Sequence, residues 1–364
     1  MTEAEAYLIL NALPSIGPVQ ARRLIEVAGS AAEIFSGPHS RWSLVEGVTR
    51  PALEAVAQWE KHFDAAAEWK KMEANGVELL HPGHEDYPAR LRDIYDPPLA
   101  LYCRGDVKAL GRLSIAVVGS RKTTYYGLET AKKLSYQMAY AGLCVVSGLA
   151  RGIDTAAHQG AVAAKGRTVA VLGSSLDHLY PVENKPLAQK IVETGGTVIS
   201  EFPFGTPPDR QTFPMRNRIV SGMSAGLLVV EAGESSGALI TAKMALEQGR
   251  TVFAIPGRIT SPESKGCHGL IKQGATLVEE VEDILAEYEF SGPAVPEEGS
   301  RPWPVDLSEE EKTILGIMDR DETQIDVIVR KSGLPSQKVS STLLRLEMRK
   351  LVRQLPGKIF IKTD

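Results

Sequence analysis

The chain has 364 residues, of which 43% are hydrophobic and 24% are charged, so it is long enough for two or three domains that each bury a core. Its formal net charge of −4 argues against nonspecific coating of nucleic acid through overall charge, so any phosphate binding requires local clusters of arginine and lysine. The chain has neither a long apolar run nor a basic leader segment, so we expect a cytoplasmic protein without a membrane span.

Residues 1–75 have the apolar periodicity of helices and predict a small helical domain. The stretch LPSIGPVQARRLIE places a turn at Gly17 and Pro18 between two apolar-periodic segments. This turn is similar to the helix-hairpin-helix pattern, in which turn amides contact DNA phosphate, although Pro18 lacks the N–H group of such a contact. A structural copy of the motif that does not bind DNA explains the turn equally well.

Residues 76–290 change to short β-branched runs, each followed by a glycine-containing turn and a helical stretch. Alternation of buried strands with helices is typical of a parallel sheet that is covered on both faces. We therefore predict a doubly wound α/β domain of the extended Rossmann type. The expected strands lie in SIAVVGS, LCVVSGL, TVAVLGS, TVISEFP, LLVVEAG and TVFAIPG.

Residues 291–306 are rich in proline, glycine and acidic side chains, and this composition predicts an extended linker. Beyond it, residues 307–364 contain three amphipathic segments followed by two short β-runs, the outline of a winged helix-turn-helix. Ser308 and Glu311 are spaced as a capping box at the start of its first helix.

Basic residues predominate from Arg330 onward, whereas the preceding predicted helix is acidic. A basic half of this kind suits a DNA backbone, a protein partner or a solvated face equally well. If it reads duplex DNA in a sequence-specific way, the chain is a transcription regulator. The basic side chains concerned include Lys338, Arg345, Arg349 and Lys350.

Residues that directly follow the predicted strands are candidates for an anion site, because ligands of an open parallel sheet bind at the carboxyl ends of its strands. Glycine and serine let backbone N–H groups approach phosphate at a helix N-terminus, and arginine supplies charge. A single loop of this kind can be only a tight turn, but several on one rim favour phosphate binding. They are Gly119, Ser120, Arg121 and Lys122; Ser147, Gly148, Arg151 and Gly152; and Gly233, Ser235, Ser236 and Gly237.

The segment DRQTFPMRNR, residues 209–218, has the densest group of arginines, and these surround Phe213. Positive charge beside an aromatic ring suits a single strand, because the charge follows the backbone while an unpaired base stacks on the ring. The alternative is a loop that leads into an amphipathic helix with Phe213 in the core.

The chain contains no P-loop, no HExxH and no complete GxGxxG, so the signatures of P-loop proteins, of zincins and of standard dinucleotide-binding proteins are missing. Gly233, Ser235 and Gly237 match the GxSxG nucleophile elbow, but His268 is the only histidine that follows them. A catalytic triad is therefore poorly supported, and we predict that the chain is not an enzyme.

Metal and cofactor sites are not predicted. Asp154 and His158 are four residues apart on a predicted helix, but no third ligand is near them in the sequence, so we expect a structural role for both. The cysteines Cys103, Cys144 and Cys267 form no CxxC pair and are expected to be reduced, small apolar side chains.

Several longer strings resemble successive signatures of the DNA-processing protein A family, also called DprA or Smf. They follow the family's order from about residue 80 to residue 280 and are together more specific than any single glycine loop. The strings are YPARLRDIYDPPLALYCRGD, VVGSRKTTYYG, VVSGLARGIDTAAHQGA, VAVLGSSLDHLYPVENKPLA, ISEFPFGTPPDRQTFPMRNRIVSGMS and LLVVEAGESSGALITAKMALEQGRTVFAIPG.

The resemblance implies an extended Rossmann domain that binds and protects incoming single-stranded DNA, forms a homodimer, and helps to load the RecA recombinase during natural transformation. It also implies a helical front domain and a winged-helix tail. Carried over to this sequence, it assigns DNA contacts to Arg121, Arg151, Arg210 and Phe213. The predicted site as a whole comprises Gly119, Ser120, Arg121, Ser147, Gly148, Arg151, Arg210, Phe213, Arg216, Asn217 and Arg218.

The runner-up interpretation is a Rossmann-like enzyme or sensor that acts on a small phosphorylated nucleotide, because the architecture also resembles nucleotide-processing proteins of the lysine decarboxylase-like group. Those proteins have a PGGxGT signature with a following Glu. The corresponding stretch here, EAGESSGALIT, lacks it.

Overall fold

A computed structural model describes residues 1–289, 307–318, 322–349 and 351–362. The chain divides into two compact units, Met1–Ala294 and Val295–Asp364, which are described separately here. The linker that was predicted at residues 291–306 lies outside the described residues.

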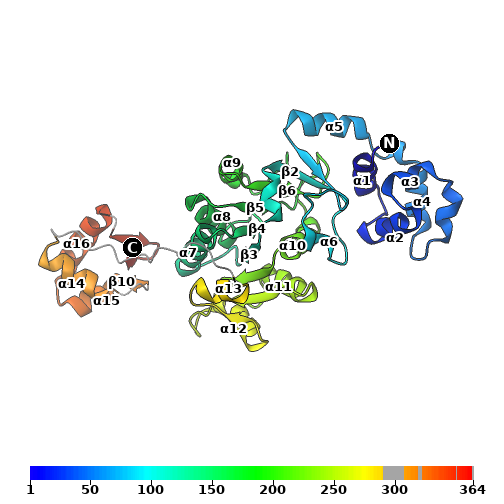
Figure 1. Ribbon diagram of the computed structural model, residues 1–364. Helices are drawn as coiled ribbons and strands as arrows, with labels where there is room; N and C mark the ends of the chain where they lie inside the picture. Colours follow the sequence, from blue (N-terminus) through cyan, green and yellow to red (C-terminus); the bar gives the residue numbers. More distant parts are fainter. Residues whose placement is uncertain (290–306, 319–321, 350, 363–364) are drawn as a thin grey trace. The chain divides into compact units, whose positions relative to one another are not determined.

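The amino-terminal segment is helical. Thr2 and Glu5 form a capping box at the first helix, and Pro18 is the first residue of the second, where its missing N–H group has no helical partner to lose. Trp42 is buried in a core shared by these helices, which are coloured blue in Figure 1. The elements are α1 (Glu3–Ala12), α2 (Pro18–Ala28), α3 (Ala31–Ser36), η1 (His39–Leu44), α4 (Arg50–Ala57), η2 (Trp59–Lys61) and α5 (Ala65–Ala74).

The first unit is built on a sheet in the order β1-β2-β6-β5-β4-β3-β7-β8-β9. All six predicted runs are strands, and β3 to β9 run parallel, whereas β1 and β2 are antiparallel additions at one edge. The strands are β1 (Glu78–Leu80), β2 (Leu101–Gly105), β3 (Ser114–Val118), β4 (Cys144–Ser147), β5 (Thr168–Val171), β6 (Thr197–Ser200), β7 (Gly226–Val229), β8 (Thr251–Ala254) and β9 (Thr276–Leu277).

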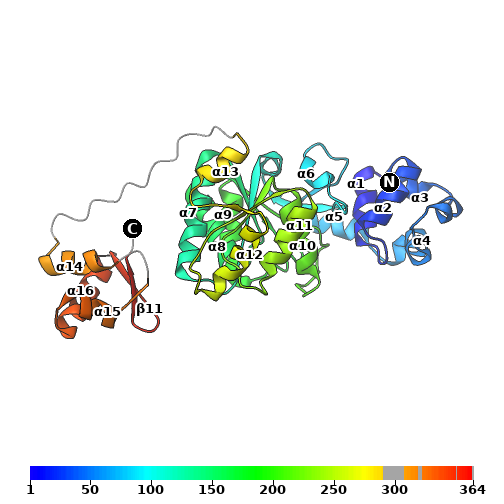
Figure 2. The ribbon, with the colours of Figure 1, turned by 90° about the horizontal axis from the view of Figure 1, so that it is seen from below.

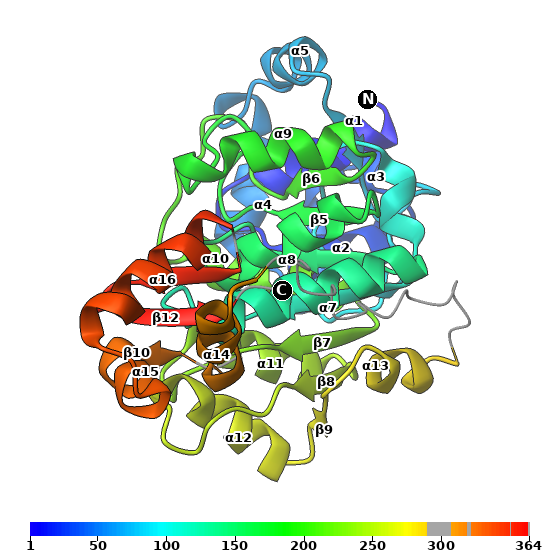
Figure 3. The same ribbon diagram turned by 90° about the vertical axis from the view of Figure 1, so that its left-hand side faces the viewer.

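Helices cover both faces of this sheet, and Figure 3 shows α7, α8 and α9 in front of it and α10 and α11 behind it. Strand order runs from β3 to β6 in one direction and from β7 to β9 in the other, so a topological switch point lies between β3 and β7. The helical elements are α6 (Ala89–Arg92), η3 (Val107–Gly111), α7 (Tyr125–Ala141), α8 (Ile153–Ala163), η4 (Val182–Asn184), α9 (Lys185–Glu193), α10 (Thr212–Gly222), α11 (Gly237–Glu247), η5 (Pro262–Ser264), α12 (Lys265–Lys272) and α13 (Glu282–Glu287).

The second unit is a winged helix, in which a hairpin lies beside three helices (Figure 2). The predicted capping box between Ser308 and Glu311 is confirmed. Ile314, Ile328 and Leu343 are fully buried or nearly so in its core. The elements are α14 (Glu309–Ile317), β10 (Thr323–Gln324), α15 (Ile325–Ser332), α16 (Ser336–Met348), β11 (Val352–Leu355) and β12 (Ile359–Lys362).

The basic side chains of α16 form ion pairs within their own unit. The Lys338 ammonium lies 2.5 Å from a Glu310 carboxylate oxygen, and the Arg345 guanidinium lies 3.6 Å from Glu310 and 3.8 Å from Glu311. Arg349 lies 3.9 Å from Glu311. Three basic side chains of the predicted basic half, Lys338, Arg345 and Arg349, are therefore paired with acidic residues of the helix before it. Lys350, which belonged to the same prediction, lies outside the described residues.

Among the described residues, no helix is both long enough and apolar enough to cross a membrane. The same residues contain no group of three or more His, Cys, Asp or Glu side chains that is arranged to hold a metal ion.

Candidate functional site

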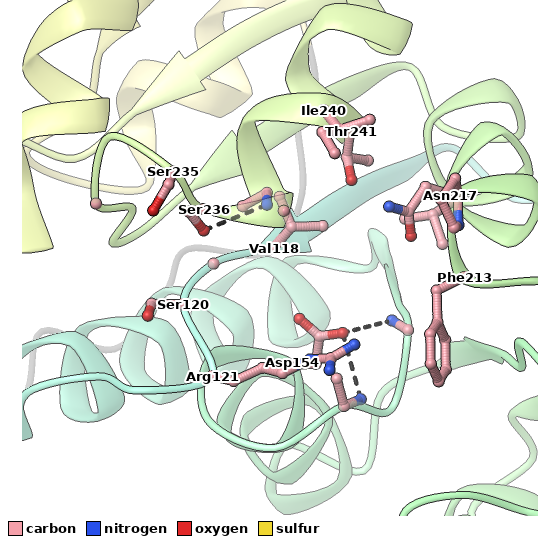
Figure 4. A pocket seen from close by; sticks show the side chains of 18 of the residues that line it. Val118, Ser120, Arg121, Asp154, Phe213, Asn217, Ser235, Ser236, Ile240 and Thr241 are labelled. Atoms are coloured by element: carbon pink, nitrogen blue, oxygen red, sulfur yellow. Dashed lines mark hydrogen bonds between the residues drawn. The ribbon is translucent and has the colours of Figure 1, made fainter. Parts of the chain in front are cut away.

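A pocket of about 540 Å³ lies at the carboxyl ends of β3, β4 and β7, next to the topological switch point. Its walls are the loops after these strands, together with α10 and the N-terminus of α11 (Figure 4). Its basic side chains are Arg121, Lys122, Arg210 and Arg216, and its acidic ones are Asp154 and Glu263. The predicted residues Gly119, Ser120, Gly148, Phe213 and Asn217 also line it.

Glu231, which is buried just after β7, anchors the loop after β3. Its carboxylate accepts hydrogen bonds from the hydroxyl groups of Thr123 and Thr124 and from the Thr124 N–H group. The Glu231 carbonyl also accepts from the Ser120 N–H group at 2.7 Å. A Cβ atom on Gly119 would lie 2.5 Å from Ile153, so only glycine fits there. The loop is thus held in one shape.

Asp154 organises the loop after β4. One of its carboxylate oxygens accepts from the N–H groups of Gly148, at 3.1 Å, and Ala150, at 3.3 Å. Burial raises the pKa of the Asp154 carboxyl, and the nearby Arg216 guanidinium opposes that rise. The Gly148 amide, which we expected to meet an anion, is therefore already engaged within the protein. The structural role that was predicted for Asp154 fits this arrangement.

Ser147 and Arg218 do not line the pocket, and their predicted roles there need correction. The Ser147 hydroxyl is fully buried and donates to the Val117 carbonyl at 2.6 Å. The Arg218 guanidinium is 8% exposed; it pairs with Glu201 and lies 3.3 Å from Asp96. Both side chains serve the fold because their polar groups are used inside it.

Arg216 is a buried arginine that reaches the pocket wall from α10. Its guanidinium donates to the carbonyl groups of Gly148 and Val171 and, at 3.1 Å, to the Asn217 side-chain oxygen. Burial lowers the pKa of this guanidinium. Arg216 therefore connects the loop after β4 and the end of β5 to α10, while Asn217 presents its amide to the cavity (Figure 4).

Arg121, Lys122 and Arg210 are exposed at the pocket, and no acidic side chain of the described residues forms an ion pair with them. The Arg121 guanidinium lies over the Phe213 ring, 5.1 Å from its centroid. The ring is half-buried against Gly173, where a Cβ atom would lie 2.7 Å from it. Phe213 thus faces the pocket from α10 and is not a core residue, contrary to the alternative that the sequence left open.

Arg151 lies next to a smaller cavity of about 20 Å³, which it lines together with Arg121, Phe213 and Tyr180. Its guanidinium lies 5.8 Å from the centroid of the Tyr180 ring, and it forms an ion pair with Glu183. Tyr180 was not among the predicted site residues. Its only signal in the sequence is an aromatic residue in the polar stretch that follows a predicted strand.

The N-terminus of α11 forms the wall of the pocket opposite Phe213 (Figure 4). The Ser236 hydroxyl caps this helix by accepting from the Ala238 N–H group at 3.3 Å, and Ser235 and Thr241 also line the cavity. Free N–H groups at a helix N-terminus favour an anion. The pocket thus combines a helix N-terminus, an aromatic ring and three cations that have no ion-pair partner among the described residues.

Comparison with family models gives two matches. Residues 78–289 match the model of DNA recombination-mediator protein A, and residues 297–358 match that of the DprA winged helix domain. The chain is 41% identical to Protein Smf of Escherichia coli over 85% of this chain and 83% of that protein. It is 46% identical to DNA processing protein DprA of Streptococcus pneumoniae over 56% of this chain and 72% of that protein.

Two solved structures are similar to this chain. DprA of Streptococcus pneumoniae matches with a TM-score of 0.69 at 36% identity, over 79% of this chain and 98% of that one. DNA processing protein A of Helicobacter pylori, whose structure concerns its single-stranded DNA binding mode, matches with a TM-score of 0.54 at 29% identity, over 60% of this chain and 97% of that one.

Proposed function

Because the chain belongs to the DNA recombination-mediator protein A family, known as DprA or Smf, we propose that the pocket at its sheet edge binds single-stranded DNA. The Helicobacter pylori relative, for which single-stranded DNA binding is described, supports this proposal. The observation that carries it is the exposed Arg121 guanidinium over the Phe213 ring at the mouth of a pocket with further unpaired cations.

Each part of this arrangement suits one part of a single strand. Arg121, Lys122 and Arg210 attract the phosphates, and the forked donors of arginine fit phosphate oxygens. Phe213 offers a ring on which an unpaired base stacks, and stacking is sequence-tolerant because every base has a π-face. A base inside a duplex has no free face, so the site favours single strands over duplex DNA.

We propose further that the protein acts by affinity and not through a chemical step. The serines that line the pocket, Ser120, Ser235 and Ser236, have no histidine beside them among the lining residues. His268, the candidate of the GxSxG motif, instead forms a hydrogen bond with the Gly257 carbonyl at 3.0 Å and is not part of the wall. A bound and protected strand is then passed to another protein.

That recipient, in our proposal, is the RecA recombinase, and the biological setting is natural transformation or recombination. The proposal rests on family membership. It predicts that the protein, which we propose forms a homodimer, accelerates assembly of RecA on single strands. Strand-exchange assays with and without the protein test the loading step, and light scattering tests the dimer. No acceleration, or a monomer at working concentration, would contradict the respective part.

Gel-shift titrations with oligo-dT and a matched duplex test the central proposal. Wild type is expected to prefer the single strand, with an affinity that falls as the salt concentration rises. Arg121→Ala, Arg210→Ala and Phe213→Ala should each weaken single-strand binding. Lys190→Ala, an exposed change on α9, is the control and should not. Preference for duplex would refute the proposal, and three variants that bind like wild type would refute the site.

The pocket volume also supports a second candidate function. About 540 Å³ falls within the usual size of small-molecule sites, and the α11 N-terminus would hold a phosphate of a nucleotide. Calorimetry with nucleoside mono- and triphosphates distinguishes the two functions. Tighter binding of a mononucleotide than of an oligonucleotide would favour the small-ligand enzyme or sensor.

A further inference from the structure

Tyr180 provides a second aromatic surface beside Phe213. Tyr180 is 39% exposed as a residue, and the two ring centroids are 6.2 Å apart with their planes inclined by 43°. The rings come from different elements, since Phe213 lies on α10 and Tyr180 lies in the loop between β5 and α9. Because the planes are inclined, the rings do not stack on each other, and Tyr180 keeps surface for another partner.

Each ring carries one guanidinium group. Arg121 lies 5.1 Å from the centroid of Phe213, and Arg151 lies 5.8 Å from the centroid of Tyr180. All four side chains line the same small cavity. Two pairs, each made of one aromatic ring and one arginine, therefore lie side by side at the edge of the main pocket.

The spacing of the rings matches an unstacked strand. Successive bases in a stacked strand rise by about 3.4 Å, which is roughly half the separation of the two rings. Adjacent bases can therefore rest on separate rings only when they are drawn apart, and proteins that recognise single strands hold bases in that form. Arg151 is available for the phosphate between them, because its partner Glu183 is about half exposed and such pairs are weak.

We propose that Tyr180 and Arg151 form a second nucleotide subsite, which binds the base and phosphate next to the nucleotide held by Phe213 and Arg121. This subsite rests on the proposed binding of single strands and extends it from one base to two. Its ligand is an unpaired nucleobase of any sequence, because the recognition is by stacking.

The test compares Tyr180→Leu with wild type on two oligomers of equal length, one of dT and one of abasic deoxyribose phosphate. Loss of one stacked base should weaken binding of the dT oligomer by about 5- to 150-fold. Binding of the abasic oligomer should change less than about twofold, since it offers no base to stack. Tyr180→Phe keeps the ring and should bind both oligomers like wild type. Tyr140→Leu is the matched control, because Tyr140 is 38% exposed at the far end of α7.

Equal binding of dT by Tyr180→Leu and wild type would overturn the proposal. An equal loss of affinity for both oligomers would also overturn it. If Tyr180 only supports the structure of its loop, its replacement should weaken binding of either oligomer to the same extent. Tyr180→Trp gives an independent measure, since stacking of a base should quench the added fluorescence on titration with dT but not with the abasic oligomer; no quenching with dT contradicts the subsite. Failure of wild type to bind any single strand would instead refute the function proposed above.

Discussion

The two units of the molecule each contain a group of basic residues, and the two groups differ in their partners. At the pocket, Arg121, Lys122 and Arg210 have no ion-pair partner among the described residues. On α16, Lys338 and Arg345 are paired with acidic side chains of α14. The number of basic residues in a stretch of sequence therefore does not tell how much positive charge is available to a ligand. In the folded protein, acidic side chains can pair with these residues.

A similar contrast exists between Arg218, which lies on α10 and is buried and paired, and Arg210, which lies just before this helix and is exposed. Arg218→Ala would leave Glu201, which is 6% exposed, without its cation. We expect the free energy of unfolding to fall by about 3–5 kcal/mol, measured by urea denaturation. Arg210→Ala should change it by less than about 0.5 kcal/mol. Similar losses for both would break the distinction.

The buried imidazole of His158 should make the free energy of unfolding depend on pH. Its ring is fully buried, lies 2.8 Å from the Thr168 hydroxyl, and has a pKa lowered by burial to about 3. The unfolded chain, with a histidine pKa of about 6.5, therefore binds more protons as the pH falls below 6.5. From pH 7 to pH 5 this group should remove about 2 kcal/mol from the free energy of unfolding.

Urea denaturation of wild type and His158→Gln at both pH values measures this effect, and the pH dependence should be smaller in the variant by that amount. Titration of the imidazole by NMR is the direct check. A His158 signal that titrates near pH 6.5 in the folded protein contradicts the prediction.

Loss of an unpaired pocket cation should weaken single-strand binding by about tenfold. Arg121→Ala removes a charge-assisted hydrogen bond to phosphate, and the lower end of the range of about 1.5–3 kcal/mol for such a bond corresponds to about tenfold in affinity. It should also reduce the slope of log affinity against log salt by about 0.7 for each phosphate released. Fluorescence anisotropy across a salt series measures both. An unchanged slope would show that Arg121 contacts no phosphate.

The smallest effect is expected on α16. The acidic partners of Lys338 and Arg345, Glu310 and Glu311, are 32% and 4% exposed, whereas Glu183, the partner of Arg151, is 53% exposed, so the pairs on α16 are harder to break. The double variant with Ala at Lys338 and Arg345 should therefore change DNA affinity by less than about twofold in the same anisotropy assay. A loss as large as that of Arg121→Ala would contradict this expectation and assign DNA binding to the winged helix as well.

Much of the fold was predictable because its central strands are continuous apolar runs followed by glycine turns. The runs at β3 to β8 were all identified from the sequence. Strands β1, β2 and β9 were missed because they are short or lack a following helix, and the antiparallel pairing of β1 and β2 has no periodic signal.

The loops that line the pocket were also predictable, because strand ends in an open parallel sheet meet at one edge. The partners of single side chains were not. In the sequence, Arg218 looks like a third arginine of a basic cluster. One of its acidic partners, Asp96, is 122 residues away in the chain. Tyr180 was missed because only folding brings its loop against Phe213.

The carboxylate of Glu231 joins two loops whose residues are about 110 positions apart in the chain. Both of its oxygens are occupied by donors from Thr123 and Thr124, so its negative charge is used to fix the frame of the pocket, and neither oxygen is left without a donor to face an incoming phosphate. Arg121 and Lys122 are therefore presented by a loop that internal hydrogen bonds hold in place without a ligand. When a loop is already ordered, binding a ligand does not cost the free energy of ordering that loop. The protein can therefore bind a flexible strand with little loss of its own conformational entropy.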